Sequence, residues 1–257
     1  PDGEPRAIGA GAVVLACGGI GGLYKNSTNF PHITGDAIAM ALRHGVACEH
    51  LDYIQIHPTT LYSHRKGRRF LISESVRGEG ALLLDKNGNR FTNELQPRDV
   101  VSAAIRAQME KDSTDHVWED MRPIGEAAIR EHFPNILERC EEEGYDPIHE
   151  PIPVVPAQHY FMGGITADLS SRTALPRLYA CGETCCNGVH GRNRLASNSL
   201  LESLVFAQRA ADDILYGEPP VFTGDKPDLA PYREQEPLFA AYRQEVLIAI
   251  ERSKNHE

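Results

Sequence analysis

Alternating apolar and polar stretches near the start of the chain predict a strand followed by a helix. Residues 12–17 form a short, continuously apolar run, which is typical of a strand buried on both faces in a parallel or mixed α/β sheet. A glycine-rich cluster follows at residues 18–22. Apolar residues between Asp36 and Gly45 then predict a helix that begins at the aspartate and ends at the glycine.

The last third of the chain returns to this α/β pattern. Residues 178–182 predict a short buried strand that ends in glycine, and residues 198–215 and 236–253 predict two long helices. Proline residues predict a loop over 217–232 between these helices. The apolar face of the first helix is predicted to consist of Leu200, Leu201, Leu204, Val205, Ala207 and Ala211.

The middle of the chain, residues 51–160, has a different pattern and predicts an α+β insertion within the α/β fold. Prolines between residues 147 and 156 predict an extended connection near its end. The other predicted elements are strands at 53–57 and 70–72, a hairpin turn at 85–89, and helices at 98–111 and 123–143.

Charge and hydropathy exclude some classes of protein. The formal net charge of −10 disfavours nonspecific binding to nucleic acid, because an acidic surface repels phosphates. No apolar run reaches the length of about 20 residues that a membrane-spanning helix needs. The chain begins at Pro1 without a signal-like segment and ends after a helical run without an obvious cap. We therefore expect a piece of a longer, cytoplasmic protein.

The six cysteines leave two alternatives, a metal site or reduced thiols. Cys181, Cys185 and Cys186 lie close together in the sequence, and His190 follows them. The sharper interpretation is a metal site, but the spacing is not Cys-x-x-Cys and no second ligand pair lies at a zinc-like distance. We expect no metal ion and reduced thiols.

The glycine cluster at residues 18–22 also has two interpretations. A strand followed by Gly-Gly-x-Gly-Gly resembles a turn whose backbone N–H groups approach a phosphate. The cluster lacks the G-x-G-x-x-G order of the dinucleotide fingerprint, however, and Gly9 and Gly11 precede a strand rather than follow one. A tight turn is the favoured interpretation from spacing alone.

Five polar strings are candidates for a binding or catalytic site. His57 is held extended by the proline that follows it, so it is either a structural histidine or a fixed donor facing a cleft. The arginines of two of these strings, Ser73–Glu79 and Arg90–Val101, have two interpretations. They either make surface salt bridges that contribute little to stability or form a clamp for carboxylates. The strings are Gln55–Thr59, Ser73–Glu79, Arg90–Val101, Gln158–Gly164 and Gly182–Glu202.

In this order and spacing, the strings resemble the succinate dehydrogenase/fumarate reductase flavoprotein family over residues 7–215. Within that family, the strings at 18–24, 27–29, 34–36 and 196–202 are most similar to the members that oxidise L-aspartate. The resemblance implies FAD as the cofactor and a C4 dicarboxylate, namely L-aspartate, fumarate or succinate, as the substrate.

Site residues follow from the resemblance position by position. Arg98 matches the arginine that exchanges a proton with the substrate, and Ser73 and Glu74 match positions that contact the substrate and this arginine. His57, His159 and Arg194 match the groups that hold the two carboxylates, and we expect them to converge with Arg98 on one cleft. The matches to FAD-contacting positions are Gly18, Gly19, Asp36, Glu183, Ser199 and Leu200.

The resemblance also implies a domain organisation. Residues 1–50 and 161–220 would be two parts of an incomplete FAD-binding, Rossmann-like domain, and residues 51–160 would be an inserted capping domain that closes over the substrate. Residues 221–257 would be a linker and the start of a C-terminal helical domain. The half of the FAD domain with the G-x-G-x-x-G turn would lie upstream of Pro1.

The function implied is FAD-dependent oxidation of L-aspartate to iminoaspartate by hydride transfer, the first step of quinolinate and NAD biosynthesis. Quinolinate synthase would then act downstream. One alternative is a soluble fumarate reductase or succinate dehydrogenase flavoprotein. Another is an isolated, non-catalytic piece that does not hold FAD.

Overall fold

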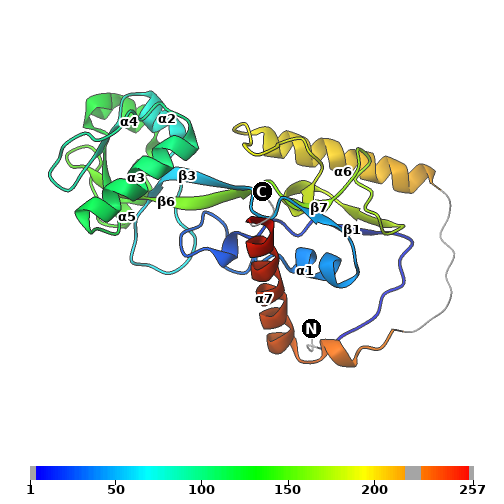
Figure 1. Ribbon diagram of the computed structural model, residues 1–257. Helices are drawn as coiled ribbons and strands as arrows, with labels where there is room; N and C mark the ends of the chain where they lie inside the picture. The colour runs from blue at the N-terminus through cyan, green and yellow to red at the C-terminus, as the bar shows by residue number, and fades with distance from the viewer. Residues whose placement is uncertain (1–3, 218–226, 255–257) are drawn as a thin grey trace. The chain divides into compact units, whose positions relative to one another are not determined.

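The computed structural model describes residues 4–217 and 227–254 and divides the chain into two compact units (Figure 1). The first unit comprises Pro1–Leu23, His32–Ile54 and Tyr160–Glu257. The second unit comprises Tyr24–Pro31 and Gln55–His159. Part of the predicted loop over 217–232 lies outside the described residues.

Over its described residues, the first unit contains two small sheets and three α-helices. Strand β1 pairs in parallel with β8, while β7 lies between β2, which is antiparallel to it, and β9, which is parallel to it. Its elements are β1 (Val13–Leu15), η1 (Gly21–Leu23), α1 (Asp36–Arg43), β2 (Cys48–Glu49), β7 (Gly164–Thr166), β8 (Leu178–Ala180), η3 (Gly182–Thr184), β9 (Cys185–Cys186), α6 (Asn198–Tyr216), η4 (Ala230–Tyr232) and α7 (Gln235–Lys254).

The predicted strands are present at β1 and β8, but the prediction that the first is buried on both faces is wrong. Val13 is 49% exposed and Val14 is 44% exposed. Within the described ranges β1 pairs only with β8, so one edge and much of its surface stay open. The apolar run therefore predicted the position of the strand but not how far its side chains are buried.

Helices α1 and α7 pack side by side within the first unit, although they are far apart in the sequence (Figure 1). The approach is close, because a Cβ atom at Gly35 would meet Ile20 Cγ2 at 2.8 Å and Val246 at 3.3 Å. The Arg43 guanidinium also donates to the Glu245 carboxylate across this pair at 2.7 Å. The predicted helices at both places are confirmed.

Helix α6 is present where it was predicted, but the prediction of its apolar face is wrong. The buried residues are Glu202, Phe206 and Ala210, which recur every four positions and so lie on one side of the helix. Ser171 Oγ donates to the Phe206 carbonyl on this side at 3.1 Å. The six residues predicted for the face are exposed: Leu200, Leu201, Leu204, Val205, Ala207 and Ala211.

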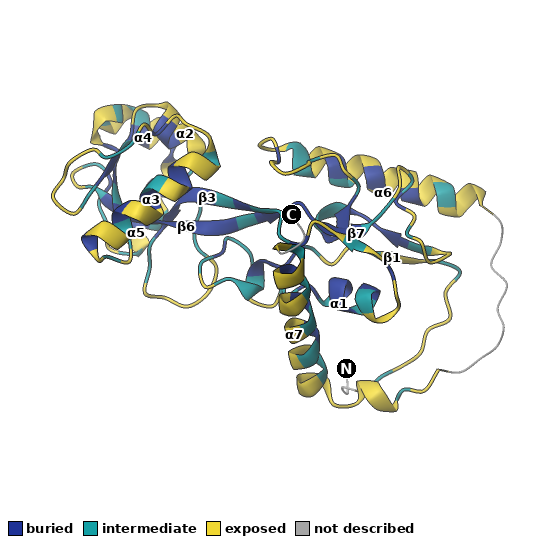
Figure 2. Cartoon of the chain, in the orientation of Figure 1, coloured by how far each residue is buried: buried dark blue, intermediate teal, exposed yellow. Residues whose placement is uncertain are grey.

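The second unit is a four-stranded sheet in the order β3-β6-β5-β4, with helices packed against it. Figure 2 shows buried strands beside helices whose outer surfaces are exposed. The core includes Val76, Val101, Ile105, Ile136 and Ile152. Its elements are β3 (Ile54–Leu61), α2 (Glu74–Gly78), β4 (Leu82–Leu84), α3 (Arg98–Asp112), β5 (Val117–Asp120), η2 (Arg122–Ile124), α4 (Glu126–His132), α5 (Pro134–Glu142) and β6 (Ile152–Phe161).

Two predictions for the second unit are wrong in detail. The single helix expected over 123–143 is broken into α4 and α5, because Pro134 has no backbone N–H to continue α4 and instead opens α5. The strand expected at 70–72 is reduced to one bridge between Leu71 and Thr60. The predicted turn at 85–89 is confirmed, since the Asp85 amide donates to the Asn89 carbonyl at 2.9 Å.

The assignment of these stretches to cofactor, capping and C-terminal domains stays a prediction. Over the residues that the structure describes, no helix is both long and apolar enough to cross a membrane.

Candidate active site

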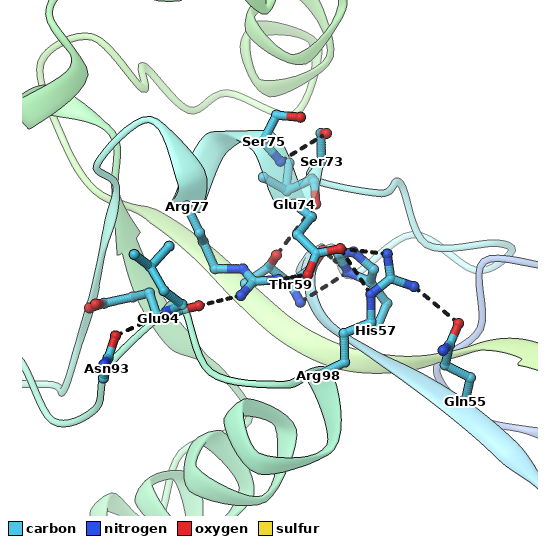
Figure 3. A network of polar contacts seen from close by, with 12 residues as sticks. Gln55, His57, Thr59, Ser73, Glu74, Ser75, Arg77, Asn93, Glu94 and Arg98 are labelled. Atoms are coloured by element: carbon cyan, nitrogen blue, oxygen red, sulfur yellow. Dashed lines mark hydrogen bonds and ion pairs between the residues drawn. The ribbon is translucent and has the colours of Figure 1, made fainter. Parts of the chain in front are cut away.

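Arg98, the predicted acid–base residue, is the first residue of α3 and is fixed by two partners in the second unit (Figure 3). Its Nε and Nη2 donate to Glu74 Oε2 at 3.1 and 2.7 Å, and its Nη1 donates to Gln55 Oε1 at 3.0 Å. Pro97, with φ −51°, precedes the helix and fixes where Arg98 begins it. A guanidinium bound through three nitrogens has little freedom to reorient.

Ser73 and Glu74 open α2, and their side chains do different things. Ser73 Oγ accepts from the Ser75 amide at 3.2 Å, so it caps the helix. The Glu74 carboxylate interacts with two arginines, because Oε2 accepts from Arg98 while Oε1 lies 3.7 Å from Arg77 Nη2. The predicted contact of Glu74 with Arg98 is therefore present, and Arg77 extends it into the core.

His57 lies near this arginine and faces His159, with 5.4 Å between the ring centroids. The His57 side chain is buried, and burial lowers its pKa well below the ordinary value, with His159, Arg98 and Arg77 acting in the same direction. The ring is therefore neutral. Its Nδ1 lies 2.9 Å from the Thr59 carbonyl oxygen, to which a protonated Nδ1 donates, and 3.2 Å from the Thr59 amide, from which an unprotonated Nδ1 accepts.

His159 is oriented by residues that the sequence analysis did not assign to the site. Its Nδ1 lies 2.9 Å from Thr28 Oγ1. The adjacent Gln158 accepts from Ser27 Oγ at 2.7 Å and from Asn29 Nδ2 at 3.1 Å. These contacts attach Tyr24–Pro31 to the second unit although that stretch is remote in sequence from the rest of it. No local pattern around Thr28 indicated this pairing.

Arg194 belongs to the first unit, where its guanidinium is buried over the Tyr160 ring at 4.4 Å from the centroid. Its Nη1 donates to Ser199 Oγ at 3.2 Å. His190 lies edge-on to the same ring at 5.4 Å, and burial lowers its pKa, with the charge of Arg194 as a smaller contribution. Arg194 and Ser199 therefore lie together, and the convergence of Arg194 with His57, Arg98 and His159 stays a prediction.

Glu183 and Gly19 form the closest approach among the residues predicted to contact FAD. A Cβ atom at Gly19 would meet Glu183 Oε1 at 2.6 Å, so a side chain there would displace the Glu183 carboxylate. Burial raises the pKa of Glu183 to about 7, while the Phe161 amide, which donates to Oε1 at 3.0 Å, and the charge of Arg194 oppose this shift. A carboxylate beside the backbone of a glycine can accept hydrogen bonds from a ligand with several hydroxyl groups, such as the ribityl chain of FAD.

The remaining predicted cofactor residues have local roles in the first unit. Gly18 has φ +77°, which favours glycine at this turn. Asp36 is the first residue of α1 and accepts from Thr34 Oγ1 at 2.8 Å. At the start of α6, the Leu200 amide donates to the Ser197 carbonyl at 3.3 Å, and the Leu200 side chain is exposed.

The part of the chain that the structure describes has no group of three or more His, Cys, Asp or Glu side chains placed to hold a metal ion. Cys181, Cys185 and Cys186 are buried free thiols there. Burial raises the pKa of each of these three, so they are poor thiolates at neutral pH.

Comparison with known proteins gives consistent relatives. The chain is 55% identical to an L-aspartate oxidase of Clostridium perfringens over 214 residues, covering 83% of this chain and 49% of that protein. It is 49% identical to an L-aspartate oxidase of Streptomyces coelicolor over 216 residues, covering 81% of this chain and 37% of that protein. The chain thus spans about half the length, or less, of these curated relatives.

Solved structures of similar fold include two quinol fumarate reductases. A quinol-fumarate reductase with menaquinol molecules has a TM-score of 0.74 and 37% identity, covering 91% of this chain and 43% of that chain. An Escherichia coli quinol fumarate reductase has a TM-score of 0.71 and 35% identity, with the same two coverages. The predicted mixed α/β flavoprotein fold and the resemblance to this family are confirmed.

The family model described as "FAD binding domain" matches residues 1–200. The match confirms the predicted cofactor, FAD, at the level of the family. By this match over most of its length, the chain belongs to the FAD binding domain family.

Proposed function

We propose that the whole protein oxidises L-aspartate to iminoaspartate with FAD as the hydride acceptor. The observation that carries this proposal is the Arg98 guanidinium, held by Glu74 and Gln55 beside the neutral His57. The L-aspartate oxidases that the chain resembles support the choice of substrate.

Binding of the substrate would divide between the two units. His57 and His159, with the orientation that Thr28 gives to the latter, would contact one carboxylate. Arg194 is buried over Tyr160 and is suited to the other carboxylate. Holding both ends of a dicarboxylate fixes the position of its reacting carbon. Such orientation can lower the activation free energy by several kcal/mol.

Arg98 would exchange a proton with the substrate. An arginine side chain ordinarily stays protonated at neutral pH, so it transfers a proton only when a partner keeps it in the reacting geometry. Glu74 supplies such a partner, because its Oε2 accepts from two nitrogens of Arg98. Its other oxygen faces Arg77, which connects the pair to the core of the second unit.

The residues of the first unit fit FAD. Glu183 would accept hydroxyl groups of its ribityl chain beside Gly18 and Gly19, while Asp36, Ser199 and Leu200 would line the same site. When bound, FAD supplies the acceptor for the hydride of the substrate. A position next to the first turn of α6 would favour negative charge on the ligand.

The similar solved structures favour a second candidate function. Both are fumarate reductases, so fumarate reduction or succinate oxidation is the alternative. A third candidate is that this chain alone does not hold FAD. A cytoplasmic location and quinolinate synthase as the enzyme that consumes the product are parts of the first proposal.

The experiment is oxidation by the whole, FAD-loaded protein. Incubation with L-aspartate is expected to yield hydrogen peroxide, and Arg98→Lys is expected to lower kcat by roughly 100-fold or more, because an acid–base group is lost. Arg130→Lys, at an exposed arginine paired with Glu126, is the matched control. Succinate oxidation without peroxide from aspartate would instead identify the alternative. Flavin absorbance of the present chain tests the third candidate.

A further inference from the structure

Gln158 is a buried, uncharged residue of β6 that attaches a remote stretch of the chain, residues 26–29, to the second unit. It is 1% exposed. Its Oε1 accepts from Ser27 Oγ at 2.7 Å and from Asn29 Nδ2 at 3.1 Å. Ser27 is also buried, and its Oγ accepts from the Asn29 amide at 3.0 Å. One buried oxygen atom therefore holds the residues before and after Thr28.

The backbone of residues 26–29 makes a short attachment to the same strand. The Gln158 amide donates to the Asn26 carbonyl at 2.9 Å, and the Thr28 amide donates to the Gln158 carbonyl at 2.9 Å. Together these bonds make one parallel bridge, between Ser27 and Gln158. Because a single bridge is a small part of a ladder, the side-chain bonds of Gln158 contribute to the register of this stretch on β6.

The register matters because Gln158 and His159 are neighbours on a strand and point to opposite faces. Ser27 and Asn29 are the residues that contact the Gln158 side chain. Between them, Thr28 Oγ1 lies 2.9 Å from His159 Nδ1. A shift by one residue would place Ser27 or Asn29 opposite His159 in place of Thr28. The Gln158 side chain therefore helps to decide which group the His159 ring meets.

Arg69 also holds residues 26–29, but it contacts only their first half. Its amide donates to the Ser27 carbonyl at 2.6 Å, and its Nε donates to Asn26 Oδ1 at 3.0 Å. Gln158 reaches beyond these two residues to Asn29. The position of Thr28 between Ser27 and Asn29 therefore depends on Gln158 as well as on Arg69.

We propose that Gln158 is a positioning residue that orients His159 through Thr28 for one carboxylate of the substrate. This role rests on the function proposed above for His159. Gln158 acts on residues 26–29 and not on the reacting atoms, so its loss should weaken binding of the substrate and leave the chemical step nearly unchanged. Because it acts through Thr28, its loss should raise KM by no more than loss of the Thr28 hydroxyl does.

The test uses the whole, FAD-loaded protein with Gln158→Met, which keeps an unbranched side chain of similar length but lacks Oε1. KM for L-aspartate is expected to rise by up to roughly 5-fold, the effect of one hydrogen bond, with little change in kcat. The dissociation constant of malonate, measured from the flavin absorbance, should rise by the same factor. Malonate is a dicarboxylate with a single methylene between its carboxylates, so its binding is measured without any turnover.

A double-mutant cycle separates positioning from a merely structural role. Gln158→Met is made both in the unsubstituted protein and in Thr28→Val. It is expected to raise KM and the dissociation constant of malonate in the first and to change neither further in the second, because the Thr28 hydroxyl is already absent there. An equal effect on both backgrounds would show that Gln158 does not act through Thr28 and would overturn the proposal.

Gln108→Met is the matched control. Gln108 is a buried glutamine of the same unit, in α3, and its Nε2 donates to Asp112 Oδ2 at 2.9 Å. This variant should leave both constants unchanged. If Gln158→Met does not fold, Ser27→Ala removes one of the two donors to Oε1 and should raise the same constants in the same direction.

Two results distinguish this proposal from the proposed function. If L-aspartate is oxidised but Gln158→Met and Ser27→Ala leave the dissociation constant of malonate unchanged, the positioning role of Gln158 is wrong and the proposed function stands. If L-aspartate is not oxidised but malonate binding shows the expected coupling of Gln158 to Thr28, the proposed function fails and the positioning role stands for a dicarboxylate site.

Discussion

Replacing Glu119 with glutamine is expected to stabilise the second unit by an amount that grows with pH. Burial raises the pKa of Glu119 from 4.5 to about 8 in the folded protein. Between these values the folded protein keeps a proton that the unfolded chain releases. The free energy of unfolding of the unsubstituted protein therefore falls as pH rises through this window, whereas a glutamine has no such titration.

The magnitude follows from the size of the shift. The difference between 4.5 and about 8 is about 3.5 pH units, and at about 1.36 kcal/mol per unit the full effect is about 5 kcal/mol. Below pH 4.5 both side chains are neutral, so this contribution vanishes there. Above pH 8 it reaches its limit, because the carboxyl is then ionised in both the folded and the unfolded protein.

Urea unfolding at a series of pH values measures this difference. Trp118 is the one tryptophan of the chain and precedes Glu119 in β5, so its fluorescence reports on the second unit. Subtracting the free energies of unfolding of the two proteins at each pH removes the effect of the titratable groups that both contain. Glu119→Leu should show the same pH dependence as Glu119→Gln, since neither titrates. If the difference in free energy of unfolding between Glu119→Gln and the unsubstituted protein is the same below pH 4.5 and above pH 8, the reasoning is refuted.

Two further predictions concern the cofactor and the substrate. Gly19→Ala should lower the FAD content of the whole protein, measured by flavin absorbance, because its Cβ would meet Glu183 Oε1 at 2.6 Å, whereas Gly78→Ala, with no atom within 4 Å, should not. Thr28→Val should raise KM for the dicarboxylate by roughly 5-fold with little change in kcat, the value expected for losing one hydrogen bond of about 1 kcal/mol to His159. An unchanged KM would remove Thr28 from the site.

Local signals predicted the helices α1, α3, α6 and α7 and the strands β1, β3 and β8, but they missed α2 and the other six described strands. Asp36 and Gly45 marked α1 correctly, because the start and end of a helix depend on nearby residues. Pro134 divides the helix predicted over 123–143, because proline has no backbone N–H to continue α4. The buried face of α6 was not predictable from apolar residues alone, because Glu202 lies on it and hydrogen-bonds to Asn187 Nδ2 at 2.5 Å.

The site was predicted to the extent that its residues lie in recognisable strings. The resemblance identified Arg98 and Glu74, and the structure shows them in contact at 2.7 Å. It did not identify Thr28, because the contact with His159 joins stretches that only the fold brings together. Ser73 Oγ caps α2, and its contact with the substrate stays a prediction.

Glu119 shows why the sequence alone was insufficient for the buried charges. Strand alternation places it on the same face as Val117 and Met121, but a carboxyl in the core contradicts the usual preference for apolar residues. Arg77 of α2 lowers the pKa of Glu119, although burial raises it by more. Because Arg77 also faces Glu74, the charge of the core is connected to Arg98 through one exposed carboxylate.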